Sequence, residues 1–166
     1  MQTHEHPLIF VVDDNSIYNQ LVAHHLRLHK FDRIECFLSG EECLQNLYKK
    51  PDIVIQDYLM EGINGIAVLK ESKKRNPHTE FVFLSGFDNF EVAADTIKYG
   101  AYDYVVKDRL ALKKLLEAIT KIRKIQLNRI PQKPRKIGIT FFLITFALVI
   151  MTLVSLPVIF PKIFTF

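Results

Sequence analysis

Leu-Ile-Phe-Val-Val-Asp-Asp, residues 8–14, is the segment most informative about the fold, because five apolar residues run directly into two adjacent carboxylates. A continuous apolar run, without the polar alternation of a half-exposed strand, is typical of a strand buried on both faces of a parallel sheet. Acids that follow such a strand lie at its carboxyl end, where open α/β sheets hold their ligands. We therefore expect the remaining elements to build a parallel sheet around this strand.

Four further short runs of strand character follow the first one, and helical patterns separate them. The runs are 33–37, 52–56, 81–84 and 102–106. The run 33–37 alternates polar and apolar residues, which indicates a strand at or near an edge, whereas the other three are nearly continuous in apolar residues. This five-fold alternation predicts a doubly wound α/β fold, with five parallel strands and five covering helices.

The helical patterns begin at residues whose side chains can cap a helix. Ser39 precedes Glu42 by three residues, which is a capping-box signature, and Gly100 can terminate the fourth helix. The five predicted caps are Asn15 or Ser16, Ser39, Asn64, Asn89 and Asp108.

The composition indicates one packed domain with an appendage. The 166 residues are 49% hydrophobic and 24% charged, which is not the profile of a disordered chain. The net charge of +4 hides a division, because residues 1–120 carry 14 basic and 18 acidic side chains, whereas the remainder carries eight basic and no acidic ones. The positive charge is therefore a poor argument for nucleic-acid binding. We expect no direct contact with nucleic acid, because the basic linker leads straight into an apolar run rather than into a DNA-reading helix.

The N-terminal residues and the cysteines both indicate a cytoplasmic domain. The predicted tail 1–7 is polar and lacks the apolar segment of a secretory signal. Cys36 and Cys43 fall in predicted core elements, so we expect two reduced thiols rather than a disulfide.

The sequence changes character after residue 127, where the globular domain 8–127 is predicted to end. Residues 128–137 contain two prolines among basic residues and are predicted to be a linker. Residues 138–160 contain no charged side chain and could cross about 30 Å of hydrocarbon at about 1.5 Å per residue. We predict one transmembrane helix here, with 161–166 as a short outer tail; a buried or partner-binding helix is the alternative.

The charges that flank this segment predict its orientation. Seven basic residues between 121 and 136 precede it, whereas only Lys162 follows it. The positive-inside rule then places the globular domain in the cytoplasm, attached to the inner membrane by a single pass. The basic residues could also lie against anionic lipid headgroups, or act only as a solvated linker.

Three carboxylates follow predicted strands in a way that suggests a metal site. Asp13 and Asp14 follow the first strand and Asp57 follows the third. If the strand order is 2-1-3-4-5, the first and third strands flank the point where strand order reverses, so the three acids converge on one crevice. They would repel one another without a cation, and hard oxygen ligands favour Mg²⁺.

A hydroxyl and an ammonium complete this pattern. Ser85 ends the fourth predicted strand and Lys107 ends the fifth. Together with Mg²⁺ they could hold the oxygens of a phosphoryl group in transit. Asp57, the most central acid, would then be the nucleophile that becomes an aspartyl phosphate. An acid pair, a single acid, a hydroxyl and a lysine at strand ends, in this order along the chain, indicate a phosphoryl-transfer site much more specifically than any one of these residues does.

Residues 8 to about 125 resemble the response regulator receiver domain (CheY-like) of two-component signal transduction. The resemblance covers the whole length of that domain. The matching segments are Phe10-Val11-Val12-Asp13-Asp14-Asn15, Asp57-Tyr58-Leu59-Met60 with Gly65, Leu84-Ser85-Gly86, and Gly100-Ala101-Tyr102-Asp103-Tyr104-Val105-Val106-Lys107.

The resemblance implies a flavodoxin-like fold and transfer of a phosphoryl group to Asp57 from a histidine kinase or phosphotransfer protein. It implies a metal site in which Mg²⁺ is held by Asp13, Asp14, Asp57 and the backbone carbonyl of Leu59. It also implies that Ser85 and Lys107 contact the phosphoryl group, and that Tyr104 turns inward when Ser85 moves. Such a protein is a phosphoacceptor that assists its own phosphotransfer and dephosphorylation rather than an enzyme. A face of the fourth helix, fifth strand and fifth helix would bind a downstream partner or a second copy.

Two positions depart from the family pattern. Glu61 stands where the family usually has proline, which should loosen that turn. Asp108 follows Lys107 where the family often has a cis-linked proline, and a cis bond before another residue costs roughly 3 kcal/mol. Neither departure removes a reacting group.

Three other interpretations compete with a membrane-held phosphorylation switch. One is a non-switching, membrane-anchored adaptor that uses the receiver fold as a docking surface. A second is an aspartate-nucleophile phosphatase, although Asp13-Asp14-Asn15 lacks the second aspartate two residues after the nucleophile. The third is a metal site on the helix that carries His24, His25 and His29, where a solvated or partly buried helix face is the simpler interpretation.

Overall fold

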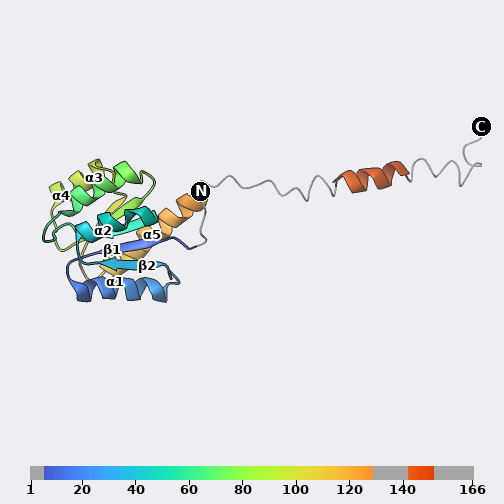
Figure 1. The fold of residues 1–166 in the computed structure, drawn as a ribbon. Helices are drawn as coiled ribbons and strands as arrows, with labels where there is room; N and C mark the ends of the chain where they lie inside the picture. The colour runs from blue at the N-terminus through green and yellow to red at the C-terminus, as the bar shows by residue number, and fades with distance from the viewer. Residues whose placement is uncertain (1–5, 129–141, 152–166) are drawn as a thin grey trace, which may run out of the picture. The chain divides into compact units, whose positions relative to one another are not determined.

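The computed structural model describes residues 6–128 and 142–151. The chain divides into two compact units, Met1–Ile130 and Pro131–Phe166, and each is described by itself. The first unit is a five-stranded parallel sheet with strand order β2-β1-β3-β4-β5, as the sequence predicts. Figure 1 shows the strands with helices on both sides of them.

The strands lie within two residues of the predicted apolar runs. Their bounds are β1 (Ile9–Val12), β2 (Ile34–Phe37), β3 (Ile53–Gln56), β4 (Glu80–Ser85) and β5 (Asp103–Val106). All residues of β1 and β3 are buried, whereas three of the four residues of β2 are only half-buried. The alternating run lies at the edge of the sheet formed by the described residues, in agreement with the prediction of a strand at or near an edge.

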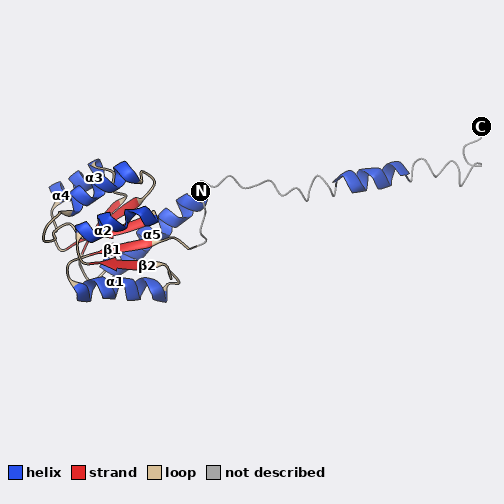
Figure 2. Cartoon of the chain, viewed as in Figure 1, coloured by secondary structure: helices blue, strands red, loops and turns tan. Residues whose placement is uncertain are grey.

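The helices alternate with the strands along the chain, and Figure 2 shows them as separate layers about the sheet. Their bounds are α1 (Ser16–Leu28), α2 (Gly40–Asn46), the short 3₁₀ helix η1 (Leu47–Lys49), α3 (Gly65–Arg75), α4 (Phe90–Lys98) and α5 (Ala111–Asn128). Successive side chains of β1 enter different cores, because they point to opposite faces of the sheet. Ile9 packs in the core that includes α1 and α5, and Phe10 packs in the core that includes α2 and α3.

Four of the five predicted caps occupy the N-cap positions of their helices, whereas Asp108 lies three residues before Ala111, the first residue of α5. Asn15, Ser39, Asn64 and Asn89 each accept a hydrogen bond from the first turn of their helix, and Asp108 accepts one from the amide of Leu110. The capping box at α2 is only half formed. The Glu42 carboxylate accepts from the amide of Leu38 rather than from that of Ser39.

The second unit contains a helix at residues 142–151 whose side chains are exposed. Across 6–128 and 142–151, no helix is both long enough and apolar enough to cross a membrane. The other parts of the predicted transmembrane segment 138–160 lie outside the described residues. So do the tail 161–166 and the linker 128–137 apart from Asn128.

Candidate functional site

The acid residues meet because β1 and β3 are neighbours in register. Val12 pairs with Gln56, so Asp13 and Asp57 follow at the same edge of the sheet. The amide of Asp57 donates to the carbonyl of Val12 over 2.8 Å, which continues the ladder to the acid itself. Carboxylate oxygens of Asp13, Asp14 and Asp57 lie within 4.8 Å of one another, so the structure brings the three predicted acids together.

Lys107 reaches this cluster from the end of β5. Its Nζ donates to Asp13 Oδ2 and to Asp57 Oδ2, both over 2.7 Å. Its own amide donates to the carbonyl of Ser85 over 2.7 Å, which fixes the backbone beside the end of β4. The lysine side chain is 17% exposed, and those of Asp13 and Asp57 are 6% and 9% exposed. The ammonium therefore bridges two buried carboxylates.

The charges of the cluster are not balanced by this bridge, since three carboxylates face one ammonium. Burial raises the pKa of Asp57 despite the hydrogen bond from Lys107. Burial by itself would lower the pKa of Lys107, but its hydrogen bonds to Asp13 and Asp57 outweigh that effect, and the pKa is raised. The cluster has a net negative charge that a divalent cation would neutralise.

The oxygen atoms of the cluster suit Mg²⁺. Asp57 Oδ1 is buried and has no hydrogen-bond partner among the described residues. Asp13 Oδ1 accepts from the amide of Asn15 (2.9 Å), and Asp14 Oδ2 accepts from the amide of Glu61 (3.3 Å). A buried oxygen without a donor, beside two further carboxylates, fits a hard cation. The carbonyl of Leu59, in the loop after β3, stays a predicted ligand.

Ser85 and Tyr104 are linked through one residue of the β4–α4 loop. Ser85 is buried, and its Oγ accepts from the amide of Phe87 over 3.2 Å. Tyr104 donates its hydroxyl to the carbonyl of the same Phe87 over 2.5 Å. Burial raises the pKa of Tyr104, so it is a neutral donor at physiological pH. A movement of Ser85 would therefore shift Phe87, whose carbonyl accepts the hydrogen bond from Tyr104.

Two residues that support the site were not anticipated from the sequence. The ring of Tyr18 lies 4.6 Å from Lys107 Nζ, a cation–π distance that adds a second attraction on the ammonium. Asn19 is buried, and its Nδ2 donates to the carbonyls of Val11, Asp13 and Phe37. It ties the ends of β1 and β2 together below the acids. Both follow the cap of α1 by one turn, but residue type alone does not distinguish them from ordinary helix residues.

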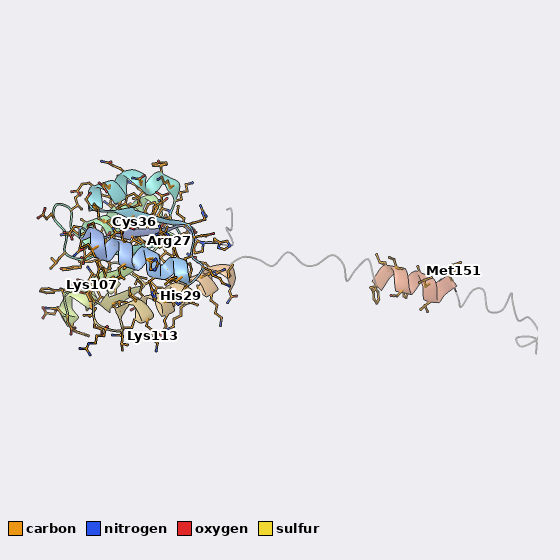
Figure 3. All side chains as sticks on the ribbon, turned by 90° about the horizontal axis from the view of Figure 1, so that it is seen from below. Arg27, His29, Cys36, Lys107, Lys113 and Met151 are labelled. Carbon is orange, nitrogen blue, oxygen red and sulfur yellow. The ribbon has the colours of Figure 1, made fainter. Side chains whose placement is uncertain are left out.

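The structure shows the geometry of two features that the sequence left open, the Lys107–Asp108 peptide bond and the histidines near the end of α1. The described residues contain no cis peptide bond, so Lys107 and Asp108 are joined in trans. His25 and His29 have ring centroids 4.6 Å apart. They lie toward the opposite end of α1 from Lys107, which contacts the start of that helix (Figure 3). Within the described part of the chain, the acid cluster is the one group of three or more potential ligands.

The cysteines are free thiols, as predicted. Cys43 is buried, and burial raises the pKa of its thiol to about 12, so it is protonated and unreactive in the native protein.

A family model for the response regulator receiver domain matches residues 9–120. The chain belongs to this receiver family. It is 31% identical over 139 residues to a putative response regulator NtrX-like protein of Rickettsia felis, covering 80% of this chain and 29% of the relative. It is 30% identical over 103 residues to the DNA-binding transcriptional regulator NtrC of Escherichia coli K12, covering 60% and 21%. The receiver thus spans less than a third of the length of these curated relatives.

Solved structures of receivers share the same fold. The crystal structure of NtrX from Brucella abortus is 30% identical with a TM-score of 0.66, covering 75% of this chain and 28% of that one. A receiver domain protein from Clostridium thermocellum is 26% identical with a TM-score of 0.67, covering 74% and 98%. Receiver domains bind Mg²⁺ at an acidic pocket that corresponds to Asp13, Asp14 and Asp57.

Proposed function

We propose that this receiver accepts a phosphoryl group on Asp57 from a histidine kinase or phosphotransfer protein, in a reaction that requires Mg²⁺, and that phosphorylation changes its protein partners. One observation carries the proposal. Lys107 bridges Asp13 and Asp57, and the remaining oxygen of Asp57 is buried without a hydrogen-bond partner among residues 6–128 and 142–151. Within the described part of the chain, the Asp57 carboxylate therefore combines burial, an adjacent ammonium and an oxygen open to a cation.

Each residue has a defined task in the transfer. Asp57 is the nucleophile: a carboxylate oxygen forms a bond to phosphorus while the bond from phosphorus to the donor histidine nitrogen breaks. Bound Mg²⁺ supplies charge neutralisation for the phosphoryl oxygens. Lys107 supplies a second positive charge, and Ser85 supplies a hydroxyl donor from the end of β4. Because both groups are held by the ends of strands, little reorganisation accompanies the transfer.

The hydrogen bonds of Ser85 suggest how phosphorylation is read. When the Ser85 side chain rotates so that its Oγ moves toward a phosphoryl oxygen and donates to it, the amide of Phe87 loses its acceptor. The β4–α4 loop is then free to move, and with it the carbonyl that accepts from Tyr104. Thr96 is the buried residue of α4, so this helix is held by few core contacts and can shift at low cost. The face of α4, β5 and α5 would then bind a partner or a second copy.

The chemical step is tested with a small phosphodonor. The full chain is incubated with Mg²⁺ and labelled phosphoramidate, and acid-stable, base-labile label is expected on wild type. Asp57→Asn should abolish the label, as should removal of Mg²⁺ with a chelator. Asp95→Asn, which alters an exposed acid on α4, should label normally. Label that persists in Asp57→Asn would contradict the assignment.

The switch is tested separately from the chemistry. Co-purified partners are compared with and without the phosphodonor. A change in the co-purified partners that is seen in wild type and lost in Asp57→Asn supports a phosphorylation switch. Identical partners in both states would favour a non-switching adaptor that uses the receiver as a docking surface.

The proposed location is the inner membrane, with the receiver in the cytoplasm. The uncharged segment 138–160 and the basic residues before it support this assignment. The exposed apolar side chains of the helix at 142–151 are consistent with lipid contact.

A further inference from the structure

The loop between β3 and α3, residues 57–64, is held at two points by side chains from elsewhere in the receiver. The amide of Glu61 donates to Asp14 Oδ2 over 3.3 Å. The amide of Ile63, two residues later, donates to Glu41 Oε1 over 3.0 Å. One contact ties the loop to the acid cluster, and the other ties it to the start of α2.

Glu41 is closely fitted against this loop. Gly62 has φ of +79°, and a Cβ placed on it would lie 2.7 Å from Glu41 Oε1. The loop backbone therefore passes directly beside the carboxylate, in a conformation that favours glycine. A Cβ on Gly40 would lie 2.9 Å from the carbonyl of Ile63, so the start of α2 is itself close to the loop. The half-buried Glu41 side chain has little freedom to leave its position.

The neighbouring acid makes a different contact. Glu42 accepts from the amide of Leu38, next to the cap of its own helix. Either acid gains from the positive end of the α2 dipole, but that attraction does not direct Glu41 toward Ile63. The contact between Glu41 and the loop is therefore a separate feature, not part of the helix cap.

We propose that Glu41 is a positioning residue for the Mg²⁺ site and acts through the β3–α3 loop; this rests on the proposed function. The loop carries the carbonyl of Leu59, a predicted ligand, and the amide of Glu61, which orients Asp14. Proline at position 61 would lack that amide, so this contact depends on the departure from the family pattern. Without Glu41 the amide of Ile63 has no acceptor, the loop gains freedom, and metal binding must restore its order.

The test measures Mg²⁺ affinity by titration calorimetry on the full chain in mild detergent. Glu41→Ala should raise the Mg²⁺ Kd about tenfold, the lower end of what loss of an outer contact costs a metal site. Glu41→Gln keeps an oxygen acceptor and should restore near wild-type affinity. Glu91→Ala removes an acid from the first turn of α4 and controls for the helix dipole. Thermal unfolding without Mg²⁺ separates a change in affinity from a loss of stability.

A second pair of variants tests the other point of attachment. Glu61→Pro removes the amide that donates to Asp14 and should weaken Mg²⁺ binding, whereas Glu61→Ala keeps the amide and should not. Unchanged Mg²⁺ affinity in Glu41→Ala would overturn the inference, as would an equal loss in Glu91→Ala. If wild type binds no Mg²⁺ and takes no label, the proposed function itself fails; if wild type binds Mg²⁺ and Glu41→Ala binds it equally well, only the positioning role fails.

Discussion

Lys107 is the residue whose charge makes the close approach of Asp13 and Asp57 possible. We expect Lys107→Met to lower the free energy of unfolding by about 3 kcal/mol without Mg²⁺, because removing one partner leaves two buried carboxylates facing each other. Added Mg²⁺ should restore part of the loss, since a divalent ion replaces the missing charge. Urea unfolding with and without Mg²⁺ measures both effects.

The ion pair between Lys114 and Asp108 is a matched control. It has the same 2.7 Å separation, but both side chains are more than 40% exposed. Lys114→Met should therefore lower the free energy of unfolding much less than Lys107→Met does, and the loss should show no recovery with Mg²⁺. Equal losses of unfolding free energy in Lys107→Met and Lys114→Met would mean that burial does not strengthen the Lys107 contacts.

Asp57 gives a pH-dependent prediction. Burial raises its pKa in the folded state, so its contribution to stability is present below its ordinary pKa and is lost as pH rises through the raised value. Asp57→Asn has no charge to bury, and at pH 7 without Mg²⁺ it should unfold about 2–5 °C higher than wild type. At a pH below about 4, where wild-type Asp57 is also neutral, the difference should vanish. A difference that does not depend on pH would contradict this account.

At the scale of elements, the junction between β3 and α3 is tightly constrained. A Cβ on Gly65 would lie 2.5 Å from the carbonyl oxygen of Asp57 and 2.8 Å from Phe83 Cε1. Gly65→Ala should cost about 1–3 kcal/mol, as other overpacked sites do, and should slow labelling of Asp57 by displacing its backbone. Gly86→Ala is the control, because a Cβ there meets nothing within 4 Å. Thermal unfolding and labelling rates compare the two.

The elements themselves were well predicted, for a physical reason. A strand covered on both faces must be apolar along its length, so β1, β3 and β4 are visible as runs. Helix starts were visible because an amide without a partner needs a side-chain acceptor, and Asn15, Asn64 and Asn89 supply one. The amide that donates to the Glu42 carboxylate could not be predicted, because Leu38 and Ser39 offer equivalent amides and only the local backbone selects between them.

At the scale of the whole molecule, the prediction concerns attachment to the membrane. The full chain should fractionate with membranes and resist an alkaline wash, whereas a chain ending at Asn128 should be recovered in the soluble fraction. Leu148→Arg should weaken retention, since arginine at a helix centre costs about 2.5–3.5 kcal/mol, and Leu148→Met should not. Recovery of the full wild-type chain in the soluble fraction would contradict the anchor.

From the sequence we could predict the number of strands and their order along the chain, the starts of most helices, and Asp13, Asp14, Asp57, Ser85 and Lys107 as site candidates. These follow from local rules, because burial selects apolar runs and the end of a strand precedes a loop. Which side chains contact one another became apparent in the folded chain alone. The bridge from Lys107 to Asp13 and Asp57 and the contact of Glu41 with Ile63 each join segments distant in sequence. Such contacts depend on strand register and loop path, which no single segment encodes.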